Sequence, residues 1–555
     1  MNLKDYEVSD IRHQATVRSA LWAAYGDALG FITELAKDKS AVKYRSGKSE
    51  ICSLIPWKRV LGGMYGISTN LVSGCYSDDT QLRLSTSRAI NGQGFFDVEA
   101  FAKFELTVWQ AYALGAGRGT KAATQSLTFK NKNWFNNFFS VKGNIYTNGG
   151  GNGAAMRIQP HVWAAQDLSN PISFLTDVVK NSITTHGHPR GIAGAVFHAL
   201  SLATLLQGSS LTLEKLVTIA DSCKNIPNII RSDDYLSNIW LPEWEEQLET
   251  TIDQAFEIVS NELLEDLKIS QDWLNDPQED YRNLINLLHL DKPEQRGSGT
   301  KTALISSILV LKLNKLTAQQ IIYEIVNALN TDTDTIATMF GALAGIISND
   351  IPIENIQDQK YIKSEASRLY YISQKIEVQG FVYPNLIKWT PQRSAVANIF
   401  LRDNKLELNG FGIIEPISTP SHGKQKSHYY QWFKTEWGFT ALIKIKSEYL
   451  PYSEQQNITN AHVEPLSDNK LPNQLVNKQI QQDLPLSIEN PVADINEVSI
   501  DYLTKKAIAS HFNPQIIGEH ILLLSSKNEL PIESVISYSS IIAKAKIGRD
   551  KRGVN

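Results

Sequence analysis

Cysteine is scarce in this sequence of 555 residues. It occurs only at Cys52, Cys75 and Cys223, which are too few and too scattered for a disulfide framework or a zinc site. A reducing compartment is the simplest explanation for such low cysteine usage. We therefore expect a cytoplasmic protein.

Long apolar runs and an excess of one charge are also missing. No apolar run approaches the roughly 20 residues that a membrane-spanning helix needs, and the segment from Met1 to Tyr6 lacks the apolar stretch of a signal peptide. The formal net charge is only -4. Direct binding to nucleic acid or to a membrane surface is therefore not predicted.

The composition is that of a globular protein, with 42% hydrophobic and 20% charged residues. Between residues 15 and 376, stretches with helical spacing of apolar residues alternate with loops rich in Gly, Asn and Asp. Few segments alternate with a period of two, so we predict an all-α fold for this region. The helix-like segments are residues 18–35, 96–114, 191–206, 302–313 and 318–328.

Changes in composition divide the chain into four predicted parts. Residues 1–380 form a compact helical domain, and residues 381–452 form a mixed or β-containing extension with strands expected near 409–417 and 437–445. Residues 453–499 are rich in Gln, Asn, Pro, Asp and Glu, as in a flexible linker. Residues 500–555 return to helical spacing and are expected to form a small helical module.

Two acidic clusters, Ser77 to Thr80 and Asp332 to Thr335, each place two carboxylates and a hydroxyl within four residues. Carboxylates crowded in this way repel one another unless a cation lies among them, and oxygen ligands favour Mg²⁺ or Mn²⁺ over Zn²⁺. Helix capping is the alternative, but it needs only one acid per helix. If the fold brings the clusters together, they form a two-metal site of the kind that usually catalyses hydrolysis.

A third acidic feature is the segment Gly26 to Gly30 with Glu34 after it. On a helix, Asp27 and Glu34 would share a face two turns apart. A solvated acidic stripe is the alternative. Most of the neighbouring residues are apolar, however, so these carboxylates are costly unless they have a function.

Two further loops have candidate binding residues. In the segment from Asn148 to Arg157, consecutive glycines precede a helix-forming Ala-Ala-Met-Arg stretch, so backbone N–H groups there can face an anion at a helix N-terminus. An ordinary glycine-rich turn fits equally well. In the segment from Thr185 to Pro189, His186 and His188 suit metal binding, and a hydrogen-bonding or stacking role suits them at least as well.

Taken in order, these five segments resemble the ADP-ribosylglycohydrolase family, which contains the dinitrogenase reductase-activating glycohydrolase and ADP-ribosylarginine hydrolases. Each motif alone is weak, but five in the family's order are specific, and the resemblance covers residues 15 to 350. It departs from the family at Ser77, where Thr is commoner, and at Asn330 and Thr331, where glycines are usual.

The resemblance implies an all-α fold with a binuclear Mg²⁺ or Mn²⁺ centre in the domain of residues 1–380. The implied metal ligands are Ser77, Asp78, Asp79, Asp332, Asp334 and Thr335. Glu34 and Asp79 are the implied catalytic residues, with Glu34 either acting on water or holding a metal. The implied substrate-binding residues are Gly149, Gly150, Gly151, Asn152, Gly153 and His186.

The implied function is metal-dependent hydrolysis of the glycosidic bond between ADP-ribose and a modified acceptor. ADP-ribosylarginine on a protein is the predicted substrate; serine, a nucleobase and a free metabolite remain alternatives because they share the ADP-ribose half. The alternative function is a relative that binds ADP-ribose, or blocks an ADP-ribosyltransferase, with little turnover. Residues 381–555 are a candidate partner surface.

Overall fold

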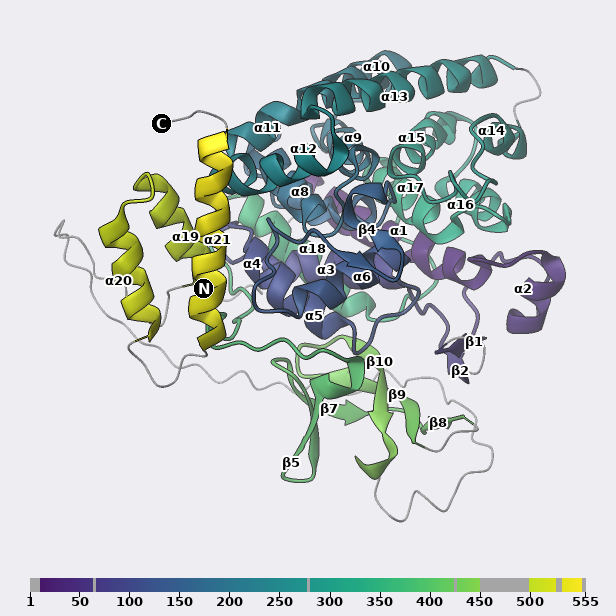
Figure 1. The fold of residues 1–555 in the computed structure, drawn as a ribbon. Coiled ribbons are helices and arrows are strands. Elements are labelled where there is room, and N and C mark those ends of the chain that lie inside the picture. The colour runs from purple at the N-terminus through teal and green to yellow at the C-terminus, as the bar shows by residue number, and fades with distance from the viewer. Residues whose placement is uncertain are drawn as a thin grey trace.

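A computed structural model describes residues 10–62, 66–276, 280–423, 427–449, 499–525 and 532–551. Figure 1 shows a large body of helices, a sheet beneath it and three further helices at one side. The predicted linker at 453–499 lies outside the described residues except for Ser499. The three boundaries between the four predicted parts stay predictions.

The body contains most of the helices. They are α1 (Ile11–Thr33), α2 (Lys39–Ser46), α3 (Asp78–Ala89), α4 (Val98–Ala100), α5 (Leu106–Trp109), α6 (Arg118–Leu127), α7 (Gln159–Trp163), α8 (Ile172–Ile183), α9 (Pro189–Leu206), α10 (Leu213–Ser222), α11 (Ile226–Ser232), α12 (Leu241–Leu248), α13 (Ile252–Leu274), α14 (Tyr281–Leu287), α15 (Gly299–Val310), α16 (Ala318–Asn327), α17 (Thr333–Ile347) and α18 (Gln359–Ser373). Short 3-10 and π turns are η2 (Phe101–Glu105), η3 (Tyr146–Asn148), η4 (Ala155–Arg157), η5 (Cys223–Asn225), η6 (Leu236–Trp240), η7 (Leu311–Asn314), η8 (Ala395–Asn398) and η9 (Ser447–Tyr449).

Helices α1 and α17 are in backbone contact. A Cβ atom on Gly26 would lie 2.3 Å from the carbonyl oxygen of Ala337, so no larger residue fits without moving a helix. The hydroxyl of Thr338 donates to the carbonyl of Ala23 at 2.8 Å, which fixes the register of the pair. This contact places the start of α17 beside the second half of α1.

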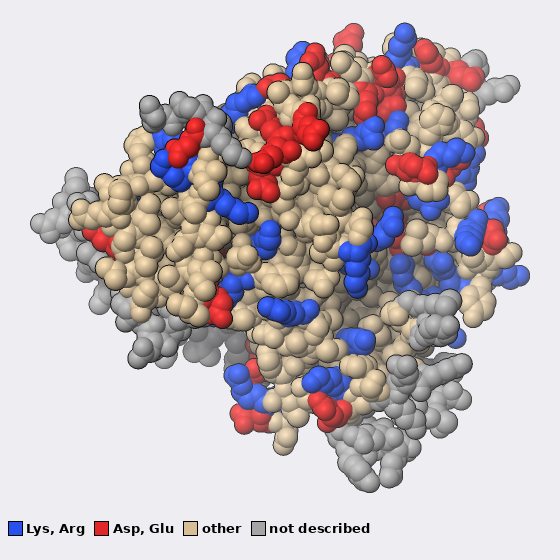
Figure 2. Space-filling model, in the orientation of Figure 1, with Lys and Arg blue, Asp and Glu red and all other residues tan. Residues whose placement is uncertain are grey.

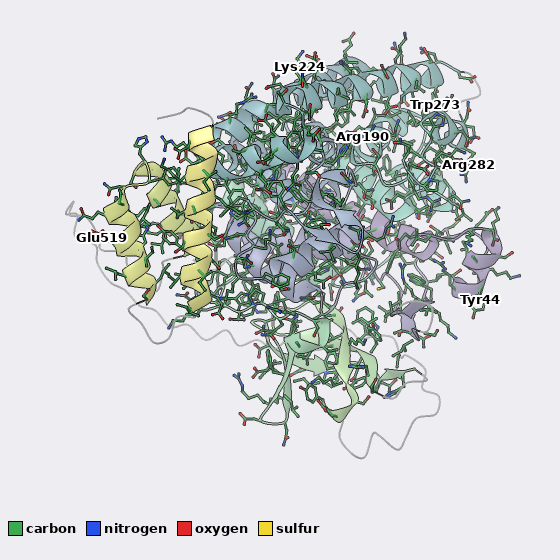
Figure 3. All side chains as sticks on the ribbon, in the orientation of Figure 1. Tyr44, Arg190, Lys224, Trp273, Arg282 and Glu519 are labelled. Atoms are coloured by element: carbon green, nitrogen blue, oxygen red, sulfur yellow. The ribbon has the colours of Figure 1, made fainter. Side chains whose placement is uncertain are left out.

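Most of α9 is buried in the body. Among the described residues it is the one helix long and apolar enough to cross a membrane by length and composition, but 83% of its 18 residues are buried inside the protein. Side chains fill the space between the helices of the body, as Figure 3 shows. By contrast, Tyr44 of α2 points away from the body and is 92% exposed.

In the part that the structure describes, the body departs from an all-α fold because it contains two β-hairpins, and one of its expected helices is interrupted. Two hairpins form, β1 (Trp57–Leu61) with β2 (Ile67–Leu71) and β3 (Ser140–Val141) with β4 (Asn144–Ile145). The helix expected at residues 96–114 is divided into α4, the π turn η2 and α5, and it ends at Trp109. The carbonyl of Lys103 accepts hydrogen bonds from the Thr107 hydroxyl and the Trp389 indole, which compete with regular helical hydrogen bonding.

A sheet follows the body, as the composition of residues 381–452 predicted. Its strands are β5 (Ile399–Arg402), β6 (Lys405–Leu408), β7 (Gly412–Pro416), β8 (Ser421–His422), β9 (His428–Thr435) and β10 (Thr440–Lys446). They pair antiparallel in the order β10-β9-β7-β6-β5, with β8 also on β9. Rings join the sheet to the body, since Phe411 lies 5.2 Å from Phe104 and Phe439 lies 5.8 Å from Tyr112 between centroids.

Three helices form the C-terminal part of the described chain: α19 (Ile500–Ala509), α20 (Pro514–Ser525) and α21 (Ile532–Lys551). They contact the body through hydrogen bonds. The hydroxyl of Tyr235, in the body, donates to the carbonyl of Asp501. The hydroxyl of Ser534 donates to the carbonyl of Ile387, in the segment between the body and the sheet, at 3.3 Å.

Candidate active site

Asp27 connects α1 to the first acidic cluster. Its carboxylate is fully buried and accepts hydrogen bonds from the backbone N–H groups of Ser77 and Thr80, each at 2.9 Å, and from the Thr80 hydroxyl. Burial raises the pKa of Asp27, while these donors lower it. Asp27 therefore holds the first turn of α3 in place, a role that the sequence alone did not assign.

The first acidic cluster forms the start of α3. Ser77 is the N-cap, and its hydroxyl oxygen accepts from the backbone N–H of Asp79 at 3.2 Å. The capping requirement of the helix is thus met by Ser77. Asp78 and Asp79 are both buried at this end of the helix, and capping does not account for their carboxylates.

The second cluster forms the start of α17 and meets the first. The hydroxyl of Thr335 donates to Asp79 Oδ1 at 3.4 Å, across a gap of more than 250 residues in the sequence. Asp334 lies in the first turn of α17, and Asp332 is its N-cap residue. The structure thus brings the two predicted clusters together.

The carboxylates of the site strongly oppose one another's ionisation. Burial first, and then the charge of Glu34, raises the pKa of both Asp78 and Asp334 well above the usual range. Burial and the charges of Asp27, Asp78 and Asp332 do the same for Asp79. Carboxylates buried together in this way stay partly protonated at neutral pH unless a cation binds among them.

The donors fit a divalent cation in their chemistry. Asp79 Oδ2 is buried and has no hydrogen-bond partner among the described residues, which is costly for a carboxylate oxygen. The surrounding acids and hydroxyls offer only oxygen, as Mg²⁺ and Mn²⁺ prefer. Among the described residues, however, no three His, Cys, Asp or Glu side chains already stand as a complete ligand set. The six predicted ligands therefore stay a prediction, supported by donor chemistry.

Glu34 lies at this site but not on the helix. Helix α1 ends at Thr33, and Glu34 is the C-cap residue with a non-helical ψ of 131°, so the expected shared helical face with Asp27 does not form. Its carboxylate accepts from Arg59 of β1 at 2.9 Å. Burial raises the pKa of Glu34, Arg59 lowers it, and the charge of Asp332 raises it further. Glu34 therefore faces the acidic cluster.

The glycine loop lies on the Asp332 side of the cluster. The side-chain amide of Asn152 donates to Asp332 Oδ2 at 2.8 Å, and its backbone N–H donates to Gly297 at 2.9 Å. The exposed Gly149, and Gly150 and Gly151 after it, lead into this turn, with Gly150 accepting from the N–H of Gly299 at 2.8 Å.

The expectation of a helix N-terminus behind these glycines is wrong. The Ala-Ala-Met-Arg stretch forms the three-residue turn η4, and the five-residue α7 follows it. Arg157 is the physical reason, because its buried guanidinium donates back to the carbonyl of Gly153 at 3.0 Å and sideways to Asn181 at 2.8 Å. Any anion held here contacts a loop rather than a helix end.

His186 lies against the glycine loop. A Cβ atom on Gly153 would lie 3.0 Å from its Cε1 atom, so loop and ring are in contact. Burial and the charge of Arg157 lower the pKa of His186 to about 3, which keeps the imidazole neutral at pH 7. His188 is instead the N-cap of α9, accepting from the N–H of Arg190 at 3.1 Å.

Three residues at the Asp78 side were missed from the sequence. Arg59 pairs with Glu34, and the charge of Lys121 on α6 lowers the pKa of Asp78. Gly115 has a φ of +88°, and a Cβ atom on it would lie 2.7 Å from Asp78 Oδ1. None of the three belongs to a motif, although the alternation of Ile67, Thr69 and Leu71 in β2 was a signal for the hairpin that carries Arg59.

Comparisons with known proteins identify the family of the chain. A solved structure described as "ADP-ribosylglycohydrolase-related protein complex" is similar, with a TM-score of 0.43 and 18% sequence identity, over 65% of this chain and 99% of that chain. No curated protein sequence matches the chain. The model of the ADP-ribosylglycohydrolase family matches residues 9–377, well over half of the chain. The chain therefore belongs to the ADP-ribosylglycohydrolase family.

Proposed function

We propose that the protein hydrolyses the glycosidic bond between ADP-ribose and arginine of a modified protein, and so reverses ADP-ribosylation. The family supports a glycosidic hydrolase acting on ADP-ribose conjugates. The observation that carries the proposal is the meeting of the two acidic clusters at Thr335 and Asp79, beside an Asp79 oxygen without a partner among the described residues.

Two Mg²⁺ or Mn²⁺ ions are proposed as cofactors. They would be held by Ser77, Asp78, Asp79, Asp332, Asp334 and Thr335. Such ions orient substrate hydroxyls and lower the pKa of water. The carboxylates of Glu34 and Asp79 are the proposed proton acceptors for the attacking water. The ion pair with Arg59 fixes the position of the Glu34 carboxylate.

Asn152 and His186 are proposed to bind the ADP-ribose half. Arg157 donates to the hydroxyl oxygen of Thr185 at 2.8 Å, so that hydroxyl can give its own proton to Nδ1 of His186, 2.7 Å away. The neutral imidazole then carries its proton on Nε2. Nε2 faces the glycine loop, where it can donate to a phosphate or ribose oxygen.

The test is release of free ADP-ribose from an ADP-ribosylarginine peptide, with Mg²⁺, with Mn²⁺ and with a chelator. We expect metal-dependent release that disappears in Asp334→Ala. Asp272→Ala, which removes an exposed acid on α13, is the matched control and should keep full activity. Metal-dependent release that survives Asp334→Ala would contradict the site assignment.

A panel of acceptors separates the proposal from the alternative function. Peptides modified at arginine and serine, a modified nucleobase and a small ADP-ribosylated metabolite are compared under the same conditions. Preferred turnover of the arginine conjugate supports the proposal. Tight binding of ADP-ribose without turnover of any conjugate would favour a protein that only recognises ADP-ribose.

A further inference from the structure

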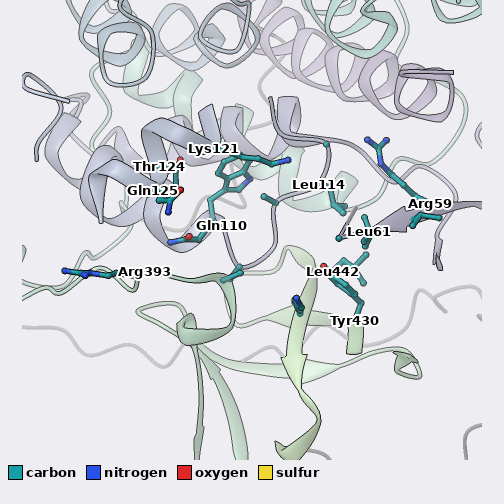
Figure 4. Close-up of a pocket in the computed structure, with 18 residues that line it drawn as sticks. Arg59, Leu61, Gln110, Leu114, Lys121, Thr124, Gln125, Arg393, Tyr430 and Leu442 are labelled. Carbon is teal, nitrogen blue, oxygen red and sulfur yellow. The ribbon is translucent and has the colours of Figure 1, made fainter. Parts of the chain in front are cut away.

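A pocket of about 480 Å³ lies between the helical body and the sheet. In Figure 4, the side chains of Lys121 and Arg59 extend from the body, and those of Tyr430 and Leu442 extend from strands of the sheet below. Arg393 adds to the wall from the segment that precedes the sheet. A concavity of this size suits a small ligand or one group of a larger one.

The charged residues that line the pocket are all cations. Arg59, Lys121, Arg393 and Lys444 contribute four positive charges, and no Asp or Glu is among the lining residues. Acids nevertheless outnumber bases in the chain, by 58 to 54. Within the part of the chain that the structure describes, no ion pair forms at Lys121, Arg393 or Lys444. Like charges around one concavity repel one another and attract an anion.

The pocket adjoins the acidic cluster on the side away from the glycine loop. One of its lining residues, Arg59, binds the Glu34 carboxylate, and another, Gly115, touches the carboxylate of Asp78. The glycine loop is joined to the cluster at Asp332 instead, through Asn152. An ADP-ribose held at the glycine loop therefore leaves this pocket for the group on the other side of the glycosidic bond.

The far wall of the pocket comes from outside the family match. That match ends at residue 377. Five lining residues follow it: Arg393, Ala395, Tyr430, Leu442 and Lys444. The extension thus adds two of the four cations to a site that the family part of the chain leaves open on this side.

We propose that the pocket binds a phosphate group carried by the acceptor, so that the sheet extension selects ADP-ribosylated proteins with a phosphate near the modified residue. The acceptor side of this proposal rests on the proposed function. Lys and Arg residues from four separate segments line this one pocket, and such cations are suited to bind phosphate. Figure 2 shows the Lys and Arg side chains in the middle of this face separated by uncharged surface rather than in a continuous band, which favours a compact phosphate over a nucleic-acid strand.

Binding of inorganic phosphate to the full-length protein saturated with ADP-ribose tests the proposal by calorimetry. We expect phosphate to bind the wild type, and the double variant Arg393→Gln/Lys444→Gln to bind it about ten-fold more weakly or less. Lys121→Gln is a second, independent variant with the same expected direction. Lys405→Gln removes an exposed cation of the same sheet outside the pocket and should change nothing. The affinity for ADP-ribose should stay the same in the double variant and in Lys405→Gln.

Three outcomes would overturn the proposal. Phosphate that fails to bind beside ADP-ribose, or binds equally well to the double variant, removes the site. Loss of ADP-ribose affinity in the double variant would show that the pocket holds the diphosphate of ADP-ribose itself. Affinity that grows with the length of a single-stranded DNA probe would identify a nucleic-acid groove. None of these measurements needs turnover, so they are independent of failure of the hydrolase assay.

Discussion

Helix α3 has buried charge at both of its ends, and the two ends differ in how that charge is balanced. At its start, burial raises the pKa of Asp79, and the charges of Asp27, Asp78 and Asp332 raise it further. At its end, Arg88 donates to both oxygens of Glu105, at 2.8 and 2.7 Å, with side chains 3% and 0% exposed. A buried charge that serves structure alone has a partner like this one.

The end of α3 at Arg88, where the buried charges are paired, also contacts the sheet extension. The guanidinium of Arg88 lies 5.3 Å from the ring of Phe411 and 5.0 Å from that of Phe439, both in the sheet region. The hydroxyl of Tyr383 donates to Glu105 at 2.8 Å. One end of α3 thus fastens the sheet, while the other leaves an oxygen of Asp79 for a ligand. We interpret the difference as that between a structural charge and a proposed functional charge within a single helix.

The largest expected effect is loss of enzyme activity on substitution at the start of α3, the unpaired end, where Asp78 and Asp79 lie. Asp79→Asn should reduce release of ADP-ribose at least a thousand-fold, equivalent to about 4 kcal/mol, because it removes a carboxylate that the chemistry needs. Its stability to urea in metal-free buffer should stay equal or rise, since the substitution relieves repulsion among buried acids. A large loss of stability would mean that Asp79 is a structural residue.

At the paired end, Arg88→Met should have the opposite profile. It leaves Glu105 buried without its partner, which typically costs about 3–5 kcal/mol in the free energy of unfolding. Urea denaturation measures this loss, and added Mg²⁺ should not restore it. Arg231→Met breaks the exposed pair with Asp253, 42% and 59% exposed, and is the control, with an expected cost below about 1 kcal/mol. Equal costs for the two variants would contradict the comparison.

Gly115→Ala should disturb the unpaired end through its geometry. The added Cβ would meet Asp78 Oδ1 at 2.7 Å, and the backbone has a positive φ, so we expect a cost of about 2–3 kcal/mol and a drop in activity. Gly119→Ala on α6 has no atom within 4 Å of its new Cβ and should be neutral in both assays. Unchanged activity in Gly115→Ala would show that the position of Asp78 is not critical.

The smallest expected effect tests crowded acids away from the active site. Glu99, buried near Asp501 and Asp97, has its pKa raised from 4.5 to about 8, first by burial and then by those two charges. The stability linked to Glu99 is fully present below pH 4.5 and is lost as pH rises through 8. Wild-type stability should therefore fall by about 1–2 kcal/mol between pH 6 and pH 8.

Glu99→Gln should flatten this decline, because the amide keeps the shape of the side chain and does not ionise. Thermal unfolding at both pH values measures the change. Glu533→Gln, an exposed acid in the first turn of α21, is the control and should keep the wild-type decline. A decline that persists in Glu99→Gln would assign the pH dependence to other groups.

Local patterns predicted much of the body and singled out the two acidic clusters that the structure brings together. The apolar spacing at 191–206 and 318–328 corresponds closely to α9 and α16, and both helices follow a capping residue, His188 and Thr317. The acidic clusters were recognisable because two acids exceed what a helix start needs, and the structure shows Ser77 doing the capping at α3.

The remaining features depend on contacts between distant segments. The helix expected at 96–114 is interrupted because Trp389, almost 300 residues later, takes the carbonyl of Lys103. The stretch after the glycine loop turns inward because Arg157 finds Asn181 as a partner. Gly115 matters only because Asp78 lies beside it in space. No spacing along the chain reports such neighbours.

The backbone contact between α1 and α17 has a consequence for how this protein can diversify. With Gly26 against Ala337, the frame that carries the acidic residues tolerates almost no drift in sequence or spacing. The pocket wall formed by the sheet extension lies outside the family match, so on our proposal its side chains can change without any change in the acidic cluster. New acceptors are therefore accessible to evolution through the appended sheet, while the reaction itself stays constant.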